Sequence, residues 1–511
     1  MQKLLYLLLM AVLPMGCQNK KQNSPERPNV ILIYLDDLGI GDLSCYGSKQ
    51  LQTPNIDQLA QEGLMFTNAY ASSATCTPSR YALMTGMYPW KKKAHVINGD
   101  APMLIATDAP TLPKTFKKAG YRTAVVGKWH LGLGNGNIDW NQTISPNPND
   151  LGFDYSYIMA ATNDRVPTVY VKNGKVDNLD PKDPIAVNYK ENFEGEPTAL
   201  THPEMLRLKW SHGHNQSIVN GVPRIGFVKG GKSAHWVDEN MTNDFLAEAQ
   251  HFIQKSNQSQ QPFFLYYAMH QPHVPRLPHP KFKGKSGLGA RGDVILEADD
   301  AIGRLMSFLK EQKIADNTLI IFSSDNGPVL SDGYADHAIA DNGTHRPWGK
   351  YRGGKYSLFN AGTNVPFIVW APKMVKKGTS DALICQMDLI NTFNECLHLA
   401  VDQHLDAQPL TNTLFGLNEK GRSHLMLEAN ARLWLRKGDW AYIPPQKGVA
   451  INPDIMIPLG RSVDEQLYNL QADTQEQVNL ADTEQQQLIQ LKKVFKEELQ
   501  GEEPMFLYMT Q

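Results

Sequence analysis

The sequence has few cysteines and almost no net charge. Its five cysteines are scattered over 511 residues, at positions 17, 45, 76, 385 and 396, which excludes a disulfide framework and a zinc ribbon. Cys385 and Cys396 are expected to be two buried thiols, with a disulfide between them as the alternative. A formal net charge of −2 indicates neither a nucleic-acid partner nor a polybasic membrane protein. The hydrophobic content of 41% and charged content of 20% are typical of a soluble globular protein with a large core.

Long hydrophobic runs are also absent. The apolar residues 4–13 follow Lys3 and are too few to span a bilayer, a pattern typical of a signal peptide, which we predict over residues 1–17. Its end, Gly16-Cys17, resembles a bacterial lipoprotein cleavage site with Cys17 as the lipidated residue; an ordinary secretory signal is the alternative. We therefore expect an exported bacterial protein, either periplasmic or anchored to the outer membrane by lipid alone, with residues 18–27 as a flexible tether.

Most of the remaining chain alternates buried, strand-like runs with amphipathic helical patterns. This alternation predicts an α/β fold with a large, mixed, mostly parallel sheet sandwiched by helices. Residues 133–235 have little periodicity, so we expect long loops and a few short strands there, which would wall a pocket. The expected strands are 29–35, 65–70, 121–126, 262–269, 317–324 and 365–370, and the expected helices are 53–60, 111–119, 238–256 and 295–310.

The pattern changes beyond about residue 400. Strand-like runs at 423–427, 433–443 and 466–470 with tight turns favour antiparallel pairing, and a polar helix is expected at 483–499. We therefore predict a large domain over residues 28–400 and a small C-terminal α+β subdomain with an antiparallel sheet over residues 401–511.

Polar side chains follow several of the predicted strands. In a parallel sheet the ligand lies beyond the carboxyl ends of the strands, so these side chains are expected to converge at one edge. The acidic and amide groups among them offer only oxygen ligands, which favours calcium or magnesium over zinc. A cation would also remove the repulsion between adjacent buried carboxylates. The residues concerned are Asp36, Asp37, Lys128, His130, His273, Asp325 and Asn326.

The stretch Cys76-Thr77-Pro78-Ser79-Arg80 combines a sulfur atom with an anion-binding pattern. Pro78 suits the first turn of a helix, which places Cys76 at a helix N-terminus, where free N–H groups favour anions. The alternative is a buried cysteine beside a turn. Together with Lys128, Lys355, two histidines and a divalent cation, the stretch indicates a site for a compact tetrahedral anion. That anion would be a phosphate or sulfate ester, with residue 76 as the nucleophile.

These residues also carry a family resemblance. The stretch from Cys76 to Arg80 matches the Cys-x-Pro-x-Arg signature of the formylglycine-dependent (type I) sulfatases, which belong to the alkaline phosphatase superfamily. The resemblance covers about residues 28–482 and implies an alkaline phosphatase-like fold with 28–400 as the sulfatase catalytic domain. Further blocks follow in the family's order: Asp36-Asp37, Gly127-Lys128-Trp129-His130-Leu131-Gly132, Pro272-His273-Val274-Pro275, Asp325-Asn326-Gly327, Gly353-Gly354-Lys355 and Gln466-Leu467-Tyr468-Asn469-Leu470.

The resemblance implies a mechanism. A maturation enzyme would oxidise Cys76 to formylglycine (3-oxoalanine), and hydration would give a geminal diol. One hydroxyl, polarised by calcium, would attack sulfur, expel the alcohol and leave a covalent sulfo-enzyme intermediate. Deprotonation of the other hydroxyl would collapse this hemiacetal, which releases sulfate and regenerates the aldehyde. By resemblance, His130 takes that proton, Arg80 and Lys128 hold the diol and the sulfate, and His273 and Lys355 act on the leaving oxygen. Calcium, with magnesium as the alternative, would be held by Asp36, Asp37, residue 76, Asp325 and Asn326.

The sequence is similar to bacterial carbohydrate sulfatases, which implies a sulfated carbohydrate as the substrate. Residues 160–178 resemble the corresponding segment of enzymes that act on galactose- or N-acetylgalactosamine-type sugars. Thr162 is the candidate for a sulfate contact, and five further residues are candidates for reading the sugar: Asn163, Asp164, Arg165, His212 and His214.

Two alternative functions remain open at this point. The first is a phosphonate or phosphate ester hydrolase of the same superfamily, and the second is an inactive glycan-binding lipoprotein. The inactive protein would have to lack either the modification signature or the metal ligands, and this sequence retains both.

Overall fold

A computed structural model describes residues 27–499 and 501 of the chain. The predicted signal peptide with Cys17, and all of the predicted tether except Arg27, lie outside the described residues. Among the residues described, no helix is both long enough and apolar enough to cross a membrane. Cys385 and Cys396 are both free thiols, as predicted. Cys385 is buried, but Cys396 is partly exposed, so the prediction that both are buried was wrong for Cys396.

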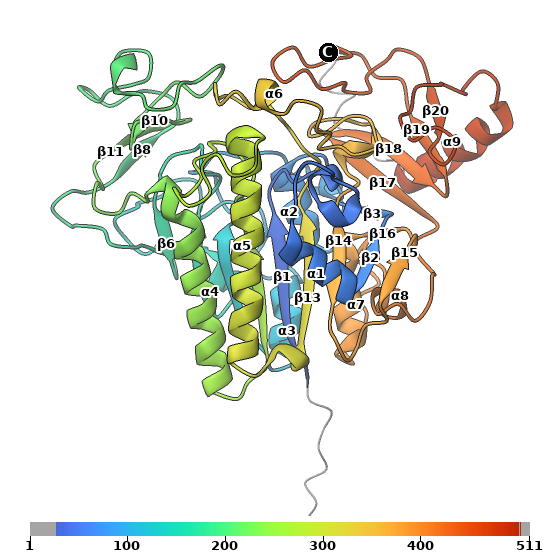
Figure 1. Cartoon of the computed structure of the whole chain (residues 1–511), viewed down its shortest axis with the longest axis horizontal. Helices are drawn as coiled ribbons and strands as arrows, with labels where there is room; N and C mark the ends of the chain where they lie inside the picture. Colours follow the sequence, from blue (N-terminus) through green and yellow to red (C-terminus); the bar gives the residue numbers. More distant parts are fainter. Residues whose placement is uncertain (1–26, 500, 502–511) are drawn as a thin grey trace, which may run out of the picture.

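A ten-stranded sheet runs through the centre of the larger unit (Figure 1). Five neighbouring strands from β13 to β5 are parallel, while β14 and β6 pair antiparallel to β13 and β5. The predicted mixed, mostly parallel sheet is therefore confirmed. In spatial order the strands are β15 (Gly378–Ser380), β2 (Leu64–Phe66), β14 (Phe367–Trp370), β13 (Thr318–Ser324), β1 (Asn29–Leu35), β12 (Phe263–Ala268), β4 (Arg122–Lys128), β5 (Tyr155–Met159), β6 (Tyr170–Lys172) and β7 (Lys175–Val176).

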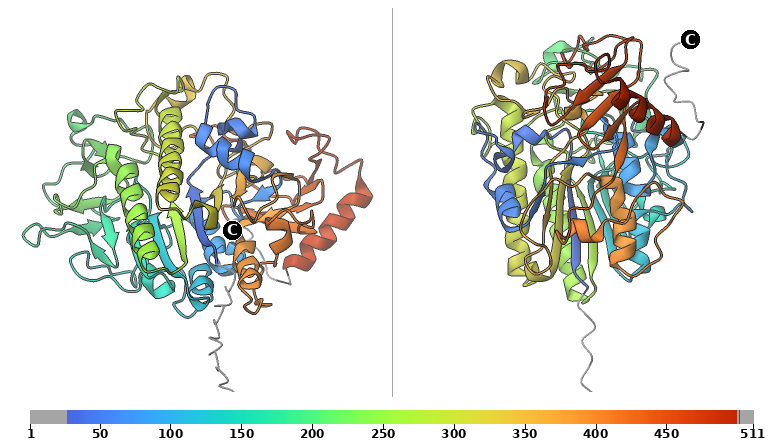
Figure 2. Two further views of the ribbon diagram at one scale, coloured as in Figure 1. Left: turned by 60° about the horizontal axis from the view of Figure 1, so that its bottom comes forward. Right: turned by 90° about the vertical axis from the view of Figure 1, so that its right-hand side faces the viewer.

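Strand β1 shows why both faces of the sheet carry helices. All seven of its residues are buried, and they divide by alternation between two hydrophobic clusters. Val30, Leu32 and Tyr34 pack on one side with α2 (Cys76–Thr85), α3 (Leu112–Lys118) and α7 (Leu389–Cys396). Ile31, Ile33 and Leu35 pack on the other side with α1 (Pro54–Glu62), α4 (Met241–Gln258) and α5 (Gly289–Glu311). The right-hand view of Figure 2 looks along the sheet, with a helical layer on either side.

Three expectations for this unit differ from the structure. The run 65–70 is two strands, because β2 joins the main sheet whereas β3 (Ala69–Tyr70) pairs with β16 (Ile384–Cys385). Strand β5 is a full member of the sheet within the region expected to be mostly loops. Helix α5 begins at Gly289 rather than at residue 295. The remaining short elements are β8 (Ala186–Asn188), β9 (Ile218–Val219), β10 (Val222–Pro223), β11 (Phe227–Lys229), α6 (Ala338–Asp341) and α8 (Thr411–Leu414).

The C-terminal part forms the expected antiparallel sheet. Its four strands pair in sequence order and pack with α9 (Gln485–Leu499), at the right of Figure 1. The hydrophobic cluster beneath this sheet also contains Tyr70, Ala82 and Trp90 of the larger unit. The two units therefore share a core, and the boundary at residue 400 stays a prediction. The strands are β17 (His424–Ala429), β18 (Arg432–Lys437), β19 (Trp440–Ile443) and β20 (Gln466–Asn469).

Strand β17 also contacts the loop that leads to Cys76. The Glu428 backbone N–H donates to the carbonyl of Ser72 at 3.1 Å, and the Ala74 N–H donates to the Glu428 carbonyl at 2.7 Å. These bonds fix the residues directly before the N-terminus of α2. The C-terminal sheet thus contributes to the position of residue 76.

A buried ion cluster connects three segments that are far apart in the sequence. Asp42 accepts two hydrogen bonds of 2.7 Å from the guanidinium of Arg291 on α5, and one of 2.9 Å from His345 Nε2. Burial alone would raise the pKa of Asp42, but Arg291 and the hydrogen bonds hold it below its ordinary value. Removing the carboxylate would leave a buried guanidinium without its counter-charge.

We therefore expect Asp42→Ala to lower the free energy of unfolding by about 3–5 kcal/mol, measured by chemical denaturation. The control is Asp316→Ala, which removes an ion pair to Lys373 whose side chains are 71% and 68% exposed. That pair is solvated on both sides, so its loss is expected to cost less than about 1 kcal/mol. Equal effects of the two variants would contradict the assigned role of the buried cluster.

Candidate active site

The carboxyl ends of four neighbouring parallel strands meet at one edge of the sheet. Asp36 and Asp37 follow β1, and Asp325 follows the adjacent β13, where its N–H donates to the Leu35 carbonyl at 3.1 Å. Lys128 is the last residue of β4, and His273 lies in the loop that follows β12. The sequence prediction that these groups converge is therefore met by the geometry.

Three buried carboxylates, those of Asp36, Asp37 and Asp325, lie within 4.8 Å of one another. Adjacent residues of an extended strand point to opposite faces, but Asp37 has a left-handed backbone (φ 62°), which breaks that alternation. Burial and the nearby Asp325 raise the pKa of Asp36 well above its ordinary value. The surrounding residues must therefore offset the electrostatic repulsion among these three carboxylates.

Each of the three buried carboxylates forms an ion pair with a buried lysine or arginine. Lys128 Nζ lies 2.6 Å from Asp36 Oδ2, and Arg80 lies 2.9 Å from Asp325 Oδ2 through both Nε and Nη2. Lys355 Nζ lies 2.9 Å from Asp37 Oδ2 and 2.8 Å from Asp332 Oδ2. With all four carboxylates of this cluster ionised, their charge exceeds that of its three cations by one, and a bound divalent cation would make the cluster net positive.

Two oxygen atoms among the described residues support such a cation. Asp36 Oδ1 and Asn326 Oδ1 are buried without a hydrogen-bond partner, while the Asn326 amide donates to Asp37 Oδ1 at 2.7 Å. A buried acceptor without a donor is costly unless something else binds it. The donor set of carboxylate and amide oxygens fits calcium or magnesium.

Cys76 begins α2 and is 3% exposed. Its sulfur lies within 4.8 Å of ligand atoms of Asp36 and His273, which places it in the carboxylate cluster. Burial raises the pKa of the Cys76 thiol to about 12. As encoded, this thiol stays protonated at neutral pH and is a poor nucleophile.

His130 is held as a neutral ring with one free nitrogen. Its Nε2 lies 2.9 Å from the Ile97 carbonyl, which can only accept, so Nε2 carries the proton. Its Nδ1 is buried without a hydrogen-bond partner. Burial lowers the pKa of His130 well below its ordinary value, and the positive charge of Lys128 lowers it further. The unprotonated Nδ1 is therefore available to accept a proton.

His273 and Lys355 face the same cluster with different charges. Nδ1 of His273 bonds to the Val274 carbonyl at 2.7 Å, and Nε2 lies 3.9 Å from Asp37 Oδ2. Burial and Lys355 hold the pKa of His273 well below its ordinary value. Burial alone would lower the pKa of Lys355, but Asp332 and Asp37 raise it well above its ordinary value. Lys355 is thus the cation of this pair.

Asp332 belongs to the site but was not among the residues predicted from the sequence. Together with Asp37 it holds Lys355, and Asp332, Asp37 and His273 form a second group with ligand atoms within 4.8 Å of one another. Asp332 follows no strand and lies in the loop after Asn326. In the sequence, the only feature that points to Asp332 is its position six residues after Asn326. Its contact with Lys355 depends on the path of the loop.

The structure brings together most, but not all, of the predicted sugar-reading residues. Asp164 accepts hydrogen bonds from Thr162, from Arg165 Nη1 at 3.0 Å and from His214 Nε2 at 2.8 Å. Asn163 donates to the Pro275 carbonyl at 3.2 Å, close in sequence to His273. His212 lies apart: its side chain is partly exposed and hydrogen-bonds only to its neighbour Ser211 among the described residues.

Arg165 connects this loop to the catalytic cluster. It is near enough to Cys76 for their charges to influence each other, and it contributes to the lowered pKa of His130. Its Nε is buried without a hydrogen-bond partner. Among the described residues, this N–H of the guanidinium has no acceptor.

Comparison with known proteins extends over most of the chain. The family model described as Sulfatase matches residues 28–399. An N-acetylgalactosamine-6-O-sulfatase of Bacteroides thetaiotaomicron is 47% identical over 488 residues, which cover 94% of this chain and 95% of the relative. The N-acetylgalactosamine-6-sulfatase of Homo sapiens is 32% identical over 380 residues, 72% of this chain and 62% of the relative.

The solved structures agree with these sequence relationships. A chain solved in a study of the metabolism of multiple glycosaminoglycans by Bacteroides thetaiotaomicron superposes with a TM-score of 0.90 at 46% identity, covering 92% of this chain and 99% of that one. A second, solved with neocarrahexaose, has a TM-score of 0.66 at 24% identity and shares the fold. With a family model over most of the chain and a near full-length relative, the chain belongs to the sulfatase family and is a hydrolase of sulfuric esters.

Proposed function

We propose that this sulfatase removes O-sulfate from galactose- or N-acetylgalactosamine-type sugars of sulfated glycans, and specifically the 6-O-sulfate of N-acetylgalactosamine. The observation that carries the proposal is 47% identity, over nearly the full length of both chains, to an N-acetylgalactosamine-6-O-sulfatase. The buried cations and the carboxylate cluster beside Cys76, together with the polar loop at Asp164, are chemistry that suits such a sulfated sugar.

The ion proposed for the carboxylate cluster is calcium, held by Asp36, Asp37, Asp325, Asn326 and residue 76. Oxygen-only ligands and two unpaired buried acceptors support it. When bound, a divalent cation acts as a Lewis acid toward sulfate oxygens and offsets the excess of carboxylate charge.

Residue 76 is proposed to work as formylglycine. The thiol is buried and holds its proton at neutral pH, so the encoded side chain cannot supply the nucleophile that its position requires. The hydrated aldehyde would supply a hydroxyl nucleophile at the N-terminus of α2.

The other residues hold charge and move protons. Arg80 and Lys128, fixed by Asp325 and Asp36, present buried positive charge to the sulfate group. His130 accepts a proton at Nδ1, which is unprotonated and free of other bonds. Lys355 neutralises the charge on the leaving oxygen. His273 Nε2 also lies near Asp37, and the negative charge of a bound sulfate ester would favour protonation of His273.

The loop with Thr162, Asp164 and Arg165 is proposed to read the sugar. His214 positions Asp164 rather than contacting the substrate, because its Nδ1 and Nε2 already face the His212 carbonyl and the Asp164 carboxylate. Arg165 offers its free Nε to the substrate.

The processing of the chain is also proposed from its sequence. Residues 1–17 would direct export to the periplasm, with Cys17 as a lipid anchor to the outer membrane. The stretch from Cys76 to Arg80 would be the segment that a formylglycine-generating maturation enzyme recognises.

We expect Cys76→Ala to lower sulfate release from N-acetylgalactosamine 6-sulfate by at least about four orders of magnitude, because the nucleophile is removed. Sulfate is measured by ion chromatography, and far-UV circular dichroism checks that the fold is kept. In the wild-type protein from a host with the maturation enzyme, mass spectrometry of the peptide with residue 76 should show the aldehyde. Turnover by the alanine variant would refute the nucleophile assignment.

Removal of the cation is expected to abolish turnover without unfolding the chain. After dialysis against a calcium chelator, added calcium should restore the rate. Calcium at about 100 times its dissociation constant should also raise the unfolding free energy by about 2.7 kcal/mol, since it binds only the folded cluster. The control is Asp36→Asn, in which the calcium-dependent shift of the unfolding midpoint should be reduced or lost. A fully active chelated enzyme would exclude the proposed metal site.

His214→Ala is expected to lower kcat/KM about tenfold or more on the sugar sulfate, since Asp164 loses a charged hydrogen bond that orients it. Turnover of an aryl sulfate, which has no sugar, should change less than about twofold. His212→Ala is the matched control, because that side chain lies outside the loop cluster and should leave both rates unchanged. Equal losses on both substrates would assign His214 to the catalytic step instead.

A further inference from the structure

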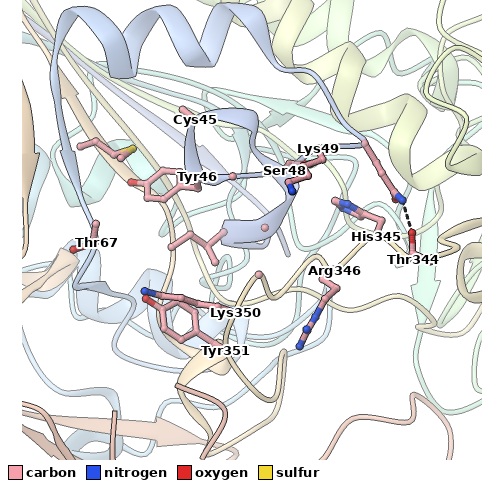
Figure 3. A pocket seen from close by; sticks show the side chains of 16 residues that line it. Cys45, Tyr46, Ser48, Lys49, Thr67, Thr344, His345, Arg346, Lys350 and Tyr351 are labelled. Atoms are coloured by element: carbon pink, nitrogen blue, oxygen red, sulfur yellow. Dashed lines mark hydrogen bonds between the residues drawn. The ribbon is translucent and has the colours of Figure 1, made fainter. Parts of the chain in front are cut away.

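A cavity of about 730 Å³ lies outside the catalytic cluster, between residues 40–50 and residues 344–351. No residue assigned to catalysis or to the cation lines it, and neither does any Asp or Glu. Figure 3 shows Lys49, Arg346 and Lys350 at its wall, with Tyr46 and Tyr351 beside them. The cavity thus combines positive charge with aromatic surface and contains no carboxylate.

A second cavity of about 430 Å³ lies on the other side of the same segment. It shares Arg346 and Tyr351 with the first and adds Trp348, Arg352 and two glutamine side chains. Its lining also contains no Asp or Glu. The two cavities are neighbours that share part of their lining, and together we call them the basic groove, defined by Lys49, Arg346, Trp348, Lys350, Tyr351 and Arg352.

The charges of this basic groove are not neutralised within the described part of the chain. Lys49, Arg346 and Lys350 are exposed and form no ion pair there, and Lys350 lies 5.4 Å from the centre of the Tyr351 ring. Arg352 lies over the Phe359 ring and donates to the Glu476 carbonyl, again without a carboxylate partner. Since the whole chain has a net charge of −2, this concentration of unpaired cations is local.

The backbone that carries these cations is fixed. The Gly41 N–H donates to the Pro347 carbonyl at 2.8 Å, and a side chain at Gly39 would meet that carbonyl oxygen at 2.1 Å. His345 is held by Asp42, which Arg291 holds in turn. An arginine on a fixed segment loses little freedom when it binds a carboxylate or sulfate, so the groove is preorganised for an anion.

We propose that the basic groove binds an anionic polysaccharide, namely further sugar units of the glycan whose sulfate is removed at residue 76. Its cations match sulfate and uronate groups, and its Trp348 and Tyr351 rings offer flat surfaces to sugar rings. Arg352 is three residues from Lys355, which limits the distance between their Cα atoms to about 11 Å. The choice of this polysaccharide rests on the proposed function, whereas anion binding by the groove does not.

The test compares polymer binding with turnover of a single sugar. In a Cys76→Ala background, the triple variant Lys49→Gln, Arg346→Gln, Lys350→Gln should bind chondroitin 6-sulfate about tenfold more weakly, by affinity electrophoresis or calorimetry at low salt. With Cys76 intact, the same triple variant should release sulfate from N-acetylgalactosamine 6-sulfate at the wild-type rate, since none of the three residues touches the catalytic cluster.

The control changes three exposed lysines elsewhere, Lys373→Gln, Lys376→Gln and Lys377→Gln, which alter the net charge equally but line neither cavity. This variant should bind the polymer like the parent protein. Equal weakening in both triple variants, unchanged binding in the groove variant, or equal binding of uncharged dextran would overturn the proposal. Failure of the wild-type enzyme to release sulfate from the single sugar would instead refute the proposed function and leave the binding result to stand by itself.

Discussion

Repulsion among three buried carboxylates is the constraint on which the site depends. Asp36, Asp37 and Asp325 follow adjacent parallel strands whose register places them at one edge, so the topology itself forces the charges together. Arg80, Lys128 and Lys355 offset that repulsion only in part, and the three carboxylates form a group that could hold a metal ion. In the function proposed above, the same buried cations hold the sulfate, so the groups that stabilise the fold would also take part in the chemistry.

Much of the fold and the centre of the site could be predicted because their signals are local. A buried strand followed by Asp36 and Asp37, or by Asp325 and Asn326, can be recognised within a dozen residues, and a parallel sheet then brings the strand ends together. Asp332 could not be predicted in this way, since its contact with Lys355 depends on the path of a loop. Strand β5 was missed for a related reason: it lies in a loop-rich region, and its pairing with β4 is long-range.

One segment of the chain contributes side chains to both the basic groove and the catalytic cluster. Residues 346–352 carry three of the four cations of the groove, and the chain then turns at Gly353 to place Lys355 in the cluster. Gly39 and Gly41 allow this segment to approach the loop after Asp37 at backbone distance. Rigidity introduced at Asp42 therefore serves both places, although no side chain of the groove reaches residue 76.

The pairing of Ser72 and Ala74 with Glu428 has a consequence for the order of events in the life of the chain. The loop that leads to residue 76 is hydrogen-bonded to a strand that is synthesised more than 340 residues later, so these bonds cannot form until most of the polypeptide exists. The maturation enzyme proposed above would therefore have to act before this loop is folded, because only 3% of Cys76 is exposed in the folded chain. On that proposal, oxidation of the cysteine would come before the C-terminal sheet is complete, and activity would begin only after its strands have folded.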